Sequence, residues 1–137
     1  MFGSRLRLPN EGPASVMNVR EVMSKEIISV DPSTTVAEAA TLMGKRQAGS
    51  ALVMDGDRLE GIFTERDVLR ALAADFDSGH HPVSHWMTKD PDTIGPDVPV
   101  EHALDLMLEG GFRHFPVAEG STVIGVVSIR DLVRPSG

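Results

Sequence analysis

The sequence contains no cysteine, which excludes disulfides, thiolate nucleophiles and cysteine-ligated zinc. No apolar run approaches the roughly 18 residues of a membrane-spanning helix, and the N-terminal stretch has no apolar signal-peptide core. Basic residues are also scarce, since 13 Lys+Arg stand against 20 Asp+Glu and give a net charge of −7. Clustered Lys and Arg hold nucleic acids and anionic membranes, so we expect neither as a partner. These absences predict a soluble cytoplasmic protein.

The length of 137 residues is that of one ordinary domain, and a hydrophobic content of 41% suits a globular core. The charge is uneven along the chain. Residues 1–20 carry three arginines against one glutamate, which leaves residues 21–137 at −9. The acidic body strengthens the argument against a general polyanion surface.

The chain repeats itself. A shift of 64 residues lays 22–69 onto 86–133 without a gap, and 12 of these 48 positions are identical. Most of the others keep their chemical character, such as Thr64 against Ser128. A register of this length indicates a tandem duplication of one supersecondary unit.

Each copy has the pattern of a β-α-β-β-α unit. The first copy predicts the following elements: a short strand over 27–30, a helix over 36–43 capped by Ser33 or Thr34, strands over 50–54 and 59–63, and a helix through Leu72. Asp55-Gly56-Asp57 predicts a hairpin turn between the two longer strands. The second copy predicts a strand near Thr93-Ile94, a helix over 100–108, strands over 114–118 and 123–127, and a last short helix at 131–133.

The fold class predicted from this pattern is α+β, with two interdependent copies that share a core, because one copy of about 48 residues buries too little surface alone. We place a flexible N-terminal arm at 1–17, the first copy at 18–75, a connector at 76–84 and the second copy at 85–137. Met23, Met43, Met87 and Met107 occupy equivalent positions and are expected to fill the core or an interface.

The candidate functional residues lie in a string that occurs twice. Thr64, Arg66 and Asp67 in the first copy correspond to Ser128, Arg130 and Asp131 in the second, each where a strand enters a helix. The hydroxyl and carboxylate form a capping-box pattern, which needs no ligand. The arginine is not required for a cap, however, and a hydroxyl, guanidinium and carboxylate together can hold a ribose phosphate. One group can cap and bind at once, so both interpretations stay open.

The duplication, the openings Val22-Met23-Ser24 and Trp86-Met87-Thr88, and the two Gly-x-x-Thr/Ser-x-x-Asp strings resemble tandem cystathionine β-synthase (CBS) domains. The resemblance covers about residues 17–134. It implies a pseudo-two-fold pair with nucleotide clefts between the copies, able to bind AMP, ADP, ATP, NAD or S-adenosylmethionine. It also implies a homodimer.

The resemblance further implies roles for particular residues. Asp67 and Asp131 would bind ribose hydroxyls, and the hydroxyls and arginines of the two strings would lie near phosphate. Adenine would contact the first strand of each copy, at Ser29-Val30 and Thr93-Ile94. A basic pair occurs once, as Arg113-His114 against Gly49-Ser50 in the first copy. We therefore expect unequal clefts, with the Asp67 cleft the better phosphate site.

The function expected is a non-catalytic sensor of adenine nucleotides, AMP foremost, that signals through its dimer or an effector protein. The alternatives are a structural dimerisation module with vestigial clefts, an S-adenosylmethionine-binding regulator and, least favoured, an enzyme acting on a bound nucleotide. No repeated catalytic triad or carboxylate pair supports the last. His80, His81 and His85 lie in the connector without a ligand helix, so no metal site is expected.

Overall fold

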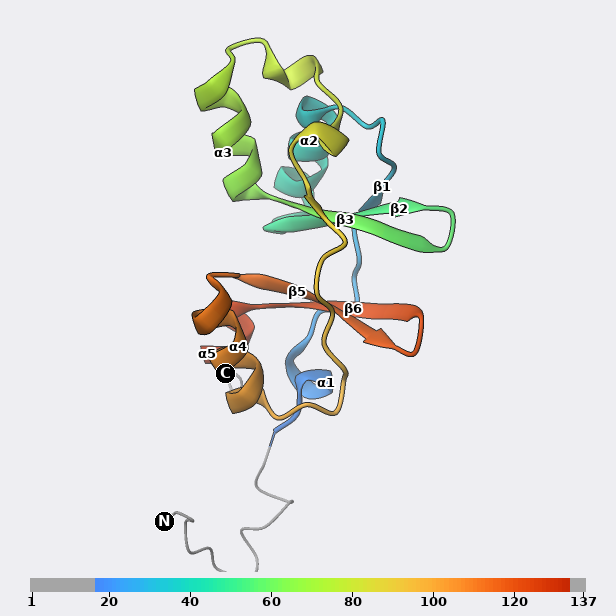
Figure 1. Cartoon of the computed structure of the whole chain (residues 1–137), viewed down its shortest axis with the longest axis vertical. Coiled ribbons are helices and arrows are strands. Elements are labelled where there is room, and N and C mark those ends of the chain that lie inside the picture. Colours follow the sequence, from blue (N-terminus) through green and yellow to red (C-terminus); the bar gives the residue numbers. More distant parts are fainter. Residues whose placement is uncertain (1–16, 134–137) are drawn as a thin grey trace, which may run out of the picture.

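The computed structural model describes residues 17–133, which form two halves stacked on each other. The first half contains β1 (Ser29–Val30), α2 (Val36–Arg46), β2 (Ser50–Asp55), β3 (Arg58–Thr64) and α3 (Glu65–Ala74). The second contains α4 (Val100–Gly110), β5 (His114–Glu119), β6 (Thr122–Ser128) and α5 (Ile129–Val133). The strands of the halves face each other and the helices lie at the two ends (Figure 1). The predicted α+β fold is confirmed; the proposed N-terminal arm lies, except for Met17, outside the described residues.

Each half is built on a β-hairpin. Strands β2 and β3 pair antiparallel, as do β5 and β6, and both hairpins carry a register shift at equivalent positions, Val53/Met54 and Val117/Ala118. The hairpin turns use Gly56 and Gly120 at φ 62° and 63°, a left-handed conformation that glycine adopts without strain. The predicted turn at Asp55-Gly56-Asp57 is therefore confirmed.

Each hairpin packs against the helices of its own half. Seven positions of the repeat are buried in both cores, and Val19 and Val83, also 64 residues apart, add an eighth. The seven are Val30, Val36, Ala39, Met43, Ala51, Val53 and Phe63 in one half and Ile94, Val100, Ala103, Met107, Phe115, Val117 and Val127 in the other. The methionines at 43 and 107 are buried, and Met23 and Met87 pack against the cores from the side. The prediction that all four methionines fill apolar space is confirmed.

The opening segment of each copy crosses to the opposite half. Between the copies lie the short helices η3 (Ser78–His80) and η4 (Val83–His85), and then β4 (Thr88–Lys89), which pairs with β3 of the first half. In the same way, Ser24 forms a bridge to Val126 of β6. Gly61 and Gly125 permit this approach, because a Cβ there would stand 2.8 Å from the Thr88 carbonyl oxygen and 2.7 Å from that of Ser24.

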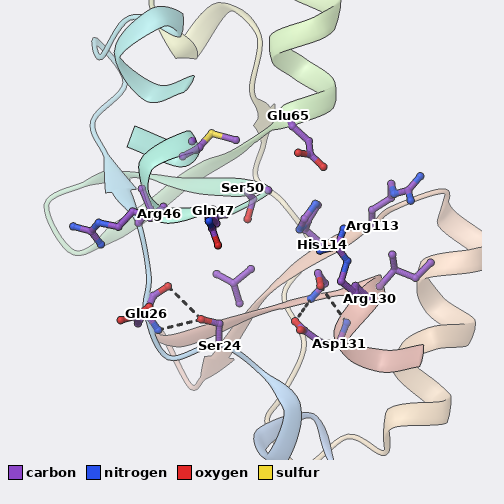
Figure 2. Close-up of a pocket in the computed structure, with 18 residues that line it drawn as sticks. Ser24, Glu26, Arg46, Gln47, Ser50, Glu65, Arg113, His114, Arg130 and Asp131 are labelled. Atoms are coloured by element: carbon purple, nitrogen blue, oxygen red, sulfur yellow. Dashed lines mark hydrogen bonds between the residues drawn. The ribbon is translucent and has the colours of Figure 1, made fainter. Parts of the chain in front are cut away.

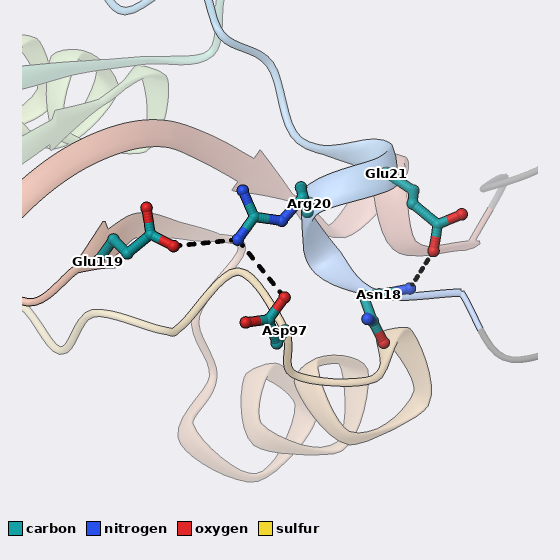
Figure 3. A network of polar contacts seen from close by, with 5 residues as sticks. All are labelled: Asn18, Arg20, Glu21, Asp97 and Glu119. Carbon is teal, nitrogen blue, oxygen red and sulfur yellow. Dashed lines mark hydrogen bonds and ion pairs between the residues drawn. The ribbon is translucent and has the colours of Figure 1, made fainter. Parts of the chain in front are cut away.

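The short helix α1 (Val19–Val22) belongs to the second half for the same reason. Val19 is fully buried in the second core, and its amide donates to the Val98 carbonyl at 2.9 Å. Arg20 adds ion pairs to Asp97 and Glu119 at 3.5 and 3.1 Å (Figure 3). Exchange of these segments ties the halves into one body and fixes the clefts between them.

Two local predictions were wrong. The cap of α2 is Thr35, whose Oγ1 accepts from the Glu38 amide, because Ser33 and Thr34 are engaged in a turn with Asp31. The strand expected near Thr93-Ile94 is reduced to a single bridge between Ile94 and Val117. In the first half the amide of Leu52 donates to the Ile28 carbonyl, but Pro116 at the equivalent position has no N–H to donate.

Candidate functional site

Two clefts open between the halves, and each contains one of the repeated strings. The Asp131 cleft has a volume of about 540 Å³ and takes residues from both halves, including Arg46, Ser50, Arg130 and Asp131 (Figure 2). The Asp67 cleft has a volume of about 680 Å³ and includes Thr64, Arg66, Asp67 and Arg70. Both volumes fall within the range of small-molecule sites.

In the Asp67 cleft the string forms the capping box that the sequence allowed. Asp67 is 5% exposed, and its Oδ2 accepts from the amide and hydroxyl of Thr64 at 2.9 and 3.1 Å. The Thr64 hydroxyl in turn accepts from the Asp67 amide at 3.3 Å. The other carboxylate oxygen, Oδ1, accepts from Arg70 at 2.7 Å. The cap therefore uses one oxygen, and an arginine that lines the cleft uses the other.

Arg70 is held from a second side as well. Its guanidinium lies 5.8 Å from the centre of the Trp86 indole, and it remains more than half exposed. The contact to Asp67 is thus made by a solvent-exposed cation rather than by a buried partner. A ligand phosphate could replace Asp67 as the partner of Arg70, which would leave Oδ1 of Asp67 free to accept another hydrogen bond.

In the Asp131 cleft the string repeats the cap without the arginine contact. The Ser128 amide donates to Asp131 Oδ2 at 2.8 Å, and the Asp131 amide donates to the Ser128 hydroxyl at 3.2 Å. Within residues 17–133 no group bonds Asp131 Oδ1. Asp131 itself lies in the cleft with Arg130 and His114 (Figure 2).

The charges of each cleft balance, although the body of the protein is strongly acidic. Three arginines and three carboxylates line the Asp131 cleft, namely Arg46, Arg113 and Arg130 with Glu26, Glu65 and Asp131. The Asp67 cleft has the same count, with Arg66, Arg70 and Arg113 against Glu65, Asp67 and Asp92. Positive side chains are thus concentrated where a small anion could enter.

His114 occupies the region between the clefts. Burial lowers the pKa of its imidazole, and the positive charges of Arg113 and Arg66 act in the same direction. Glu65 and Asp131 oppose this shift by favouring the charged form. His114 therefore has both signs of charge around it, supplied by α3, by α5 and by its neighbour in the chain.

The structure brings most of the predicted residues together. Thr64, Arg66 and Asp67 line one cleft, and Ser128, Arg130 and Asp131 line the other. Arg113 and His114 line both clefts, so the basic pair gives no preference to the Asp67 cleft.

The residues expected to contact adenine lie elsewhere. Ser29 and Val30 line a shallow hollow against α2, and Thr93 and Ile94 line neither cleft. The chain instead enters the clefts a little earlier, with Ile28 in one and Asp92 in the other. These two positions are equivalents in the repeat, because the segment that crosses between the halves passes the clefts before it joins its sheet.

Sequence reasoning also missed Glu65, Arg70 and Arg46. Glu65 stands between Thr64 and Arg66 in the string, and Arg70 lies one turn after Asp67. Their positions beside the string could have identified both as candidate site residues. Arg46 had none, because it reaches the Asp131 cleft from the end of α2 in the opposite half.

Among the described residues, no three His, Asp or Glu side chains gather closely enough to hold a metal ion. No helix between residues 17 and 133 has the length and apolar content that crossing a bilayer requires.

Comparison with known proteins gives consistent results. The chain is 42% identical over 119 residues to an uncharacterized 17.7 kDa protein of Acidianus ambivalens, covering 85% of this chain and 71% of that protein. The crystal structure of the CBS-domain containing protein ATU1752 from Agrobacterium tumefaciens matches with a TM-score of 0.83 and 29% identity, covering 88% of this chain and all of that one.

A further match is the CBS domain pair of protein MJ0100, solved in complex with 5'-methylthioadenosine and S-adenosyl-L-methionine. It has a TM-score of 0.81 and 27% identity, and the match covers 89% of this chain and 97% of that one. The family model for the CBS domain matches residues 19–74 and 83–136. The chain therefore belongs to the CBS domain family, as a tandem pair of CBS domains.

Proposed function

We propose that this CBS pair is a regulatory sensor that binds an adenine nucleotide, AMP in the first place, in the clefts between its halves. The observation that carries the proposal is the occurrence, in both clefts, of a carboxylate and an arginine at the same strand–helix junction. A carboxylate accepts from the two hydroxyls of a ribose, and guanidinium groups suit phosphate. The adenosyl ligands of MJ0100 support an adenosyl ligand here.

The two carboxylates would engage a ribose differently. Asp131 has Oδ1 unbonded within residues 17–133, so it could accept from ribose without rearrangement. Asp67 would first have to release Arg70, which lines the same cleft and could then turn to the phosphate. The ligand would thus replace one charge-assisted contact by another, while Oδ2 keeps capping α3.

The base would lie against apolar residues that line the clefts. Ile28 and Val126 line the Asp131 cleft, and Ile62 and Phe112 line the Asp67 cleft. Val126 and Ile62 are equivalents in the repeat, so both clefts offer a base the same aliphatic strand position. We assign the adenine side to these residues rather than to Ser29, Val30, Thr93 and Ile94.

Occupancy would reach the rest of the cell through an assembly. Exposed apolar residues occur on or next to α3, α4 and α5, and these helices lie on the same side of the molecule (Figure 1). They are Leu69, Leu72 and Phe76 in the first half and Leu106, Leu108, Phe112 and Val133 in the second. An apolar face of this kind suits a second copy of the chain or an effector protein. A ligand that favours one arrangement of the halves would shift that assembly.

Binding measurements test the proposal. Isothermal titration with AMP, ADP, ATP, NAD and S-adenosylmethionine should give saturable heat with at least one. The double variant Asp67→Asn/Asp131→Asn should bind that ligand about tenfold or more weakly. If only S-adenosylmethionine binds, the protein is an S-adenosylmethionine-binding regulator and not a nucleotide sensor. If none of these ligands binds, and the double variant sediments like the unaltered protein, the chain is a structural module instead.

A further inference from the structure

The two clefts share one wall. Comparison of their linings shows that three residues, Glu65, Arg113 and His114, belong to both. Every other described residue of the two linings belongs to one cleft only. A ligand in either cleft would therefore meet the same acid, the same guanidinium and the same imidazole.

These three residues are also places where the two copies differ. Glu65 corresponds to Ile129, Arg113 to Gly49 and His114 to Ser50. The arginine and carboxylate of the repeated strings are duplicated, but the charged groups of the shared wall are not. The protein thus has two ribose sites and one set of wall charges.

The wall is closely packed around its pseudo-two-fold position. The amide of Glu65 donates to the Gly49 carbonyl at 3.0 Å, and the amide of Ile129 donates to the Arg113 carbonyl at 2.8 Å. A Cβ on Gly49 would stand 3.0 Å from Cε1 of His114 and 3.5 Å from Oε1 of Glu65. The absence of a side chain at residue 49 is what admits the imidazole. The wall has no space for a second basic pair from the first half.

We propose that the two clefts compete for Arg113 and His114, so that a phosphate-bearing ligand in one cleft weakens binding of the same ligand in the other. A guanidinium has one planar fork and serves one phosphate well at a time. Two phosphates on either side of one wall also repel each other. This inference rests on the proposed function and adds a coupling between its two sites.

The expected coupling is large enough to measure. Loss of one charge-assisted hydrogen bond weakens binding by about tenfold to a hundredfold. We therefore expect AMP to bind in two steps whose affinities differ by at least tenfold beyond any intrinsic difference between the clefts. Adenosine has no phosphate, so it should fill both clefts with little coupling.

Single-cleft variants separate coupling from intrinsic affinity. Asn at residue 67 or 131 keeps one oxygen for the helix cap but replaces the other, which would accept from ribose, by an NH2 donor, so Asp67→Asn and Asp131→Asn each leave one competent cleft. Calorimetry on these variants gives the intrinsic AMP affinity of each cleft. Both values should exceed the second-step affinity of the unaltered protein. Thermal melting of both variants confirms that they fold.

Two arginine variants locate the coupling. Arg113→Gln should weaken AMP binding in both single-cleft variants and bring the two steps of the full protein closer together. Arg46→Gln is the matched control, because Arg46 lines the Asp131 cleft alone. It should weaken that cleft and leave the other unchanged.

The outcomes are distinct. Two independent AMP steps that match the single-cleft affinities overturn the coupling and leave the proposed function intact. The coupling is also overturned if one single-cleft variant binds like the unaltered protein and the other not at all, since a single working cleft has no competitor. Absence of binding by every adenosyl ligand overturns the proposed function and the coupling with it.

Discussion

Replacement of Asp67 can separate its two roles, the helix cap and the ligand site. In Asp67→Ala the Thr64 amide and hydroxyl lose the oxygen that they contact at 2.9 and 3.1 Å. In Asp67→Asn the amide oxygen can still accept from the Thr64 amide. The cap should therefore survive in the second variant and fail in the first, while both lose the carboxylate that would accept from ribose.

The magnitudes follow from these contacts. Loss of a capping interaction costs about 0.5–2 kcal/mol, so Asp67→Ala should lower the free energy of unfolding by that amount. The ion pair with Arg70 adds little, because that arginine is 56% exposed and water screens the contact. Asp67→Asn should lose less than about 1 kcal/mol. Both variants should lose AMP affinity in this cleft by about tenfold or more, since hydrogen bonds to a charged group contribute about 1.5–3 kcal/mol.

The assays are urea unfolding and calorimetric titration on the same samples. The expected pattern is a nearly unchanged unfolding midpoint with weakened AMP binding in the Asn variant, and both defects in the Ala variant. If the Asn variant bound AMP as well as the unaltered protein in both steps, Asp67 would be a cap only. The reasoning that places ribose on this carboxylate would then be wrong.

Three further results are expected. Gly61→Ala should lower the free energy of unfolding in urea by about 1–3 kcal/mol, because its Cβ would overlap the crossing segment. Gly44→Ala is the control, since a Cβ there meets open space, and it should stabilise α2 by up to about 1 kcal/mol. Equal effects of the two substitutions would contradict the packing described. Burial lowers the pKa of His114 below its ordinary value of 6.5. The unfolded chain therefore binds more protons just below pH 6.5, and the free energy of unfolding falls as the pH drops through that range. His114→Asn should make this fall smaller when melting is measured as a function of pH. An unaltered dependence of Tm on pH would show that His114 is not its source. Leu72→Glu should weaken self-association in sedimentation velocity if the apolar side of α3 forms the dimer contact, and unchanged association would place that contact elsewhere.

Much of the fold was predictable because the sequence contains an internal repeat. The 64-residue register fixed the hairpins, the helices and the buried methionines, since equivalent apolar positions must fill equivalent cores. What the register could not show was the exchange of opening segments between the halves. Met23 and Met87 were expected to fill apolar space, but only the structure shows that each lies against a glycine of the opposite hairpin.

The site was predictable to a similar depth. Asp67 and Asp131 carry a pattern that marks a strand–helix junction, and the structure places each in a cleft. The strand predicted near Ile94 is only a bridge, because Pro116 has no N–H and the pairing loses one hydrogen bond there. The sharing of Arg113 and His114 depends on how two halves meet, which no local pattern encodes.

The proposed function requires that the clefts bind an adenosyl ligand in the folded protein. Thermal melting with AMP and the other adenosyl ligands tests it most directly, with the Asp67→Asn/Asp131→Asn double variant as the control. At 100 times the dissociation constant a ligand stabilises by about 2.7 kcal/mol, which raises the Tm of a domain of this size by several degrees. We expect such a rise for the unaltered protein and a clearly smaller one for the double variant. An unchanged Tm with every ligand, or an equal rise in both proteins, would contradict this expectation.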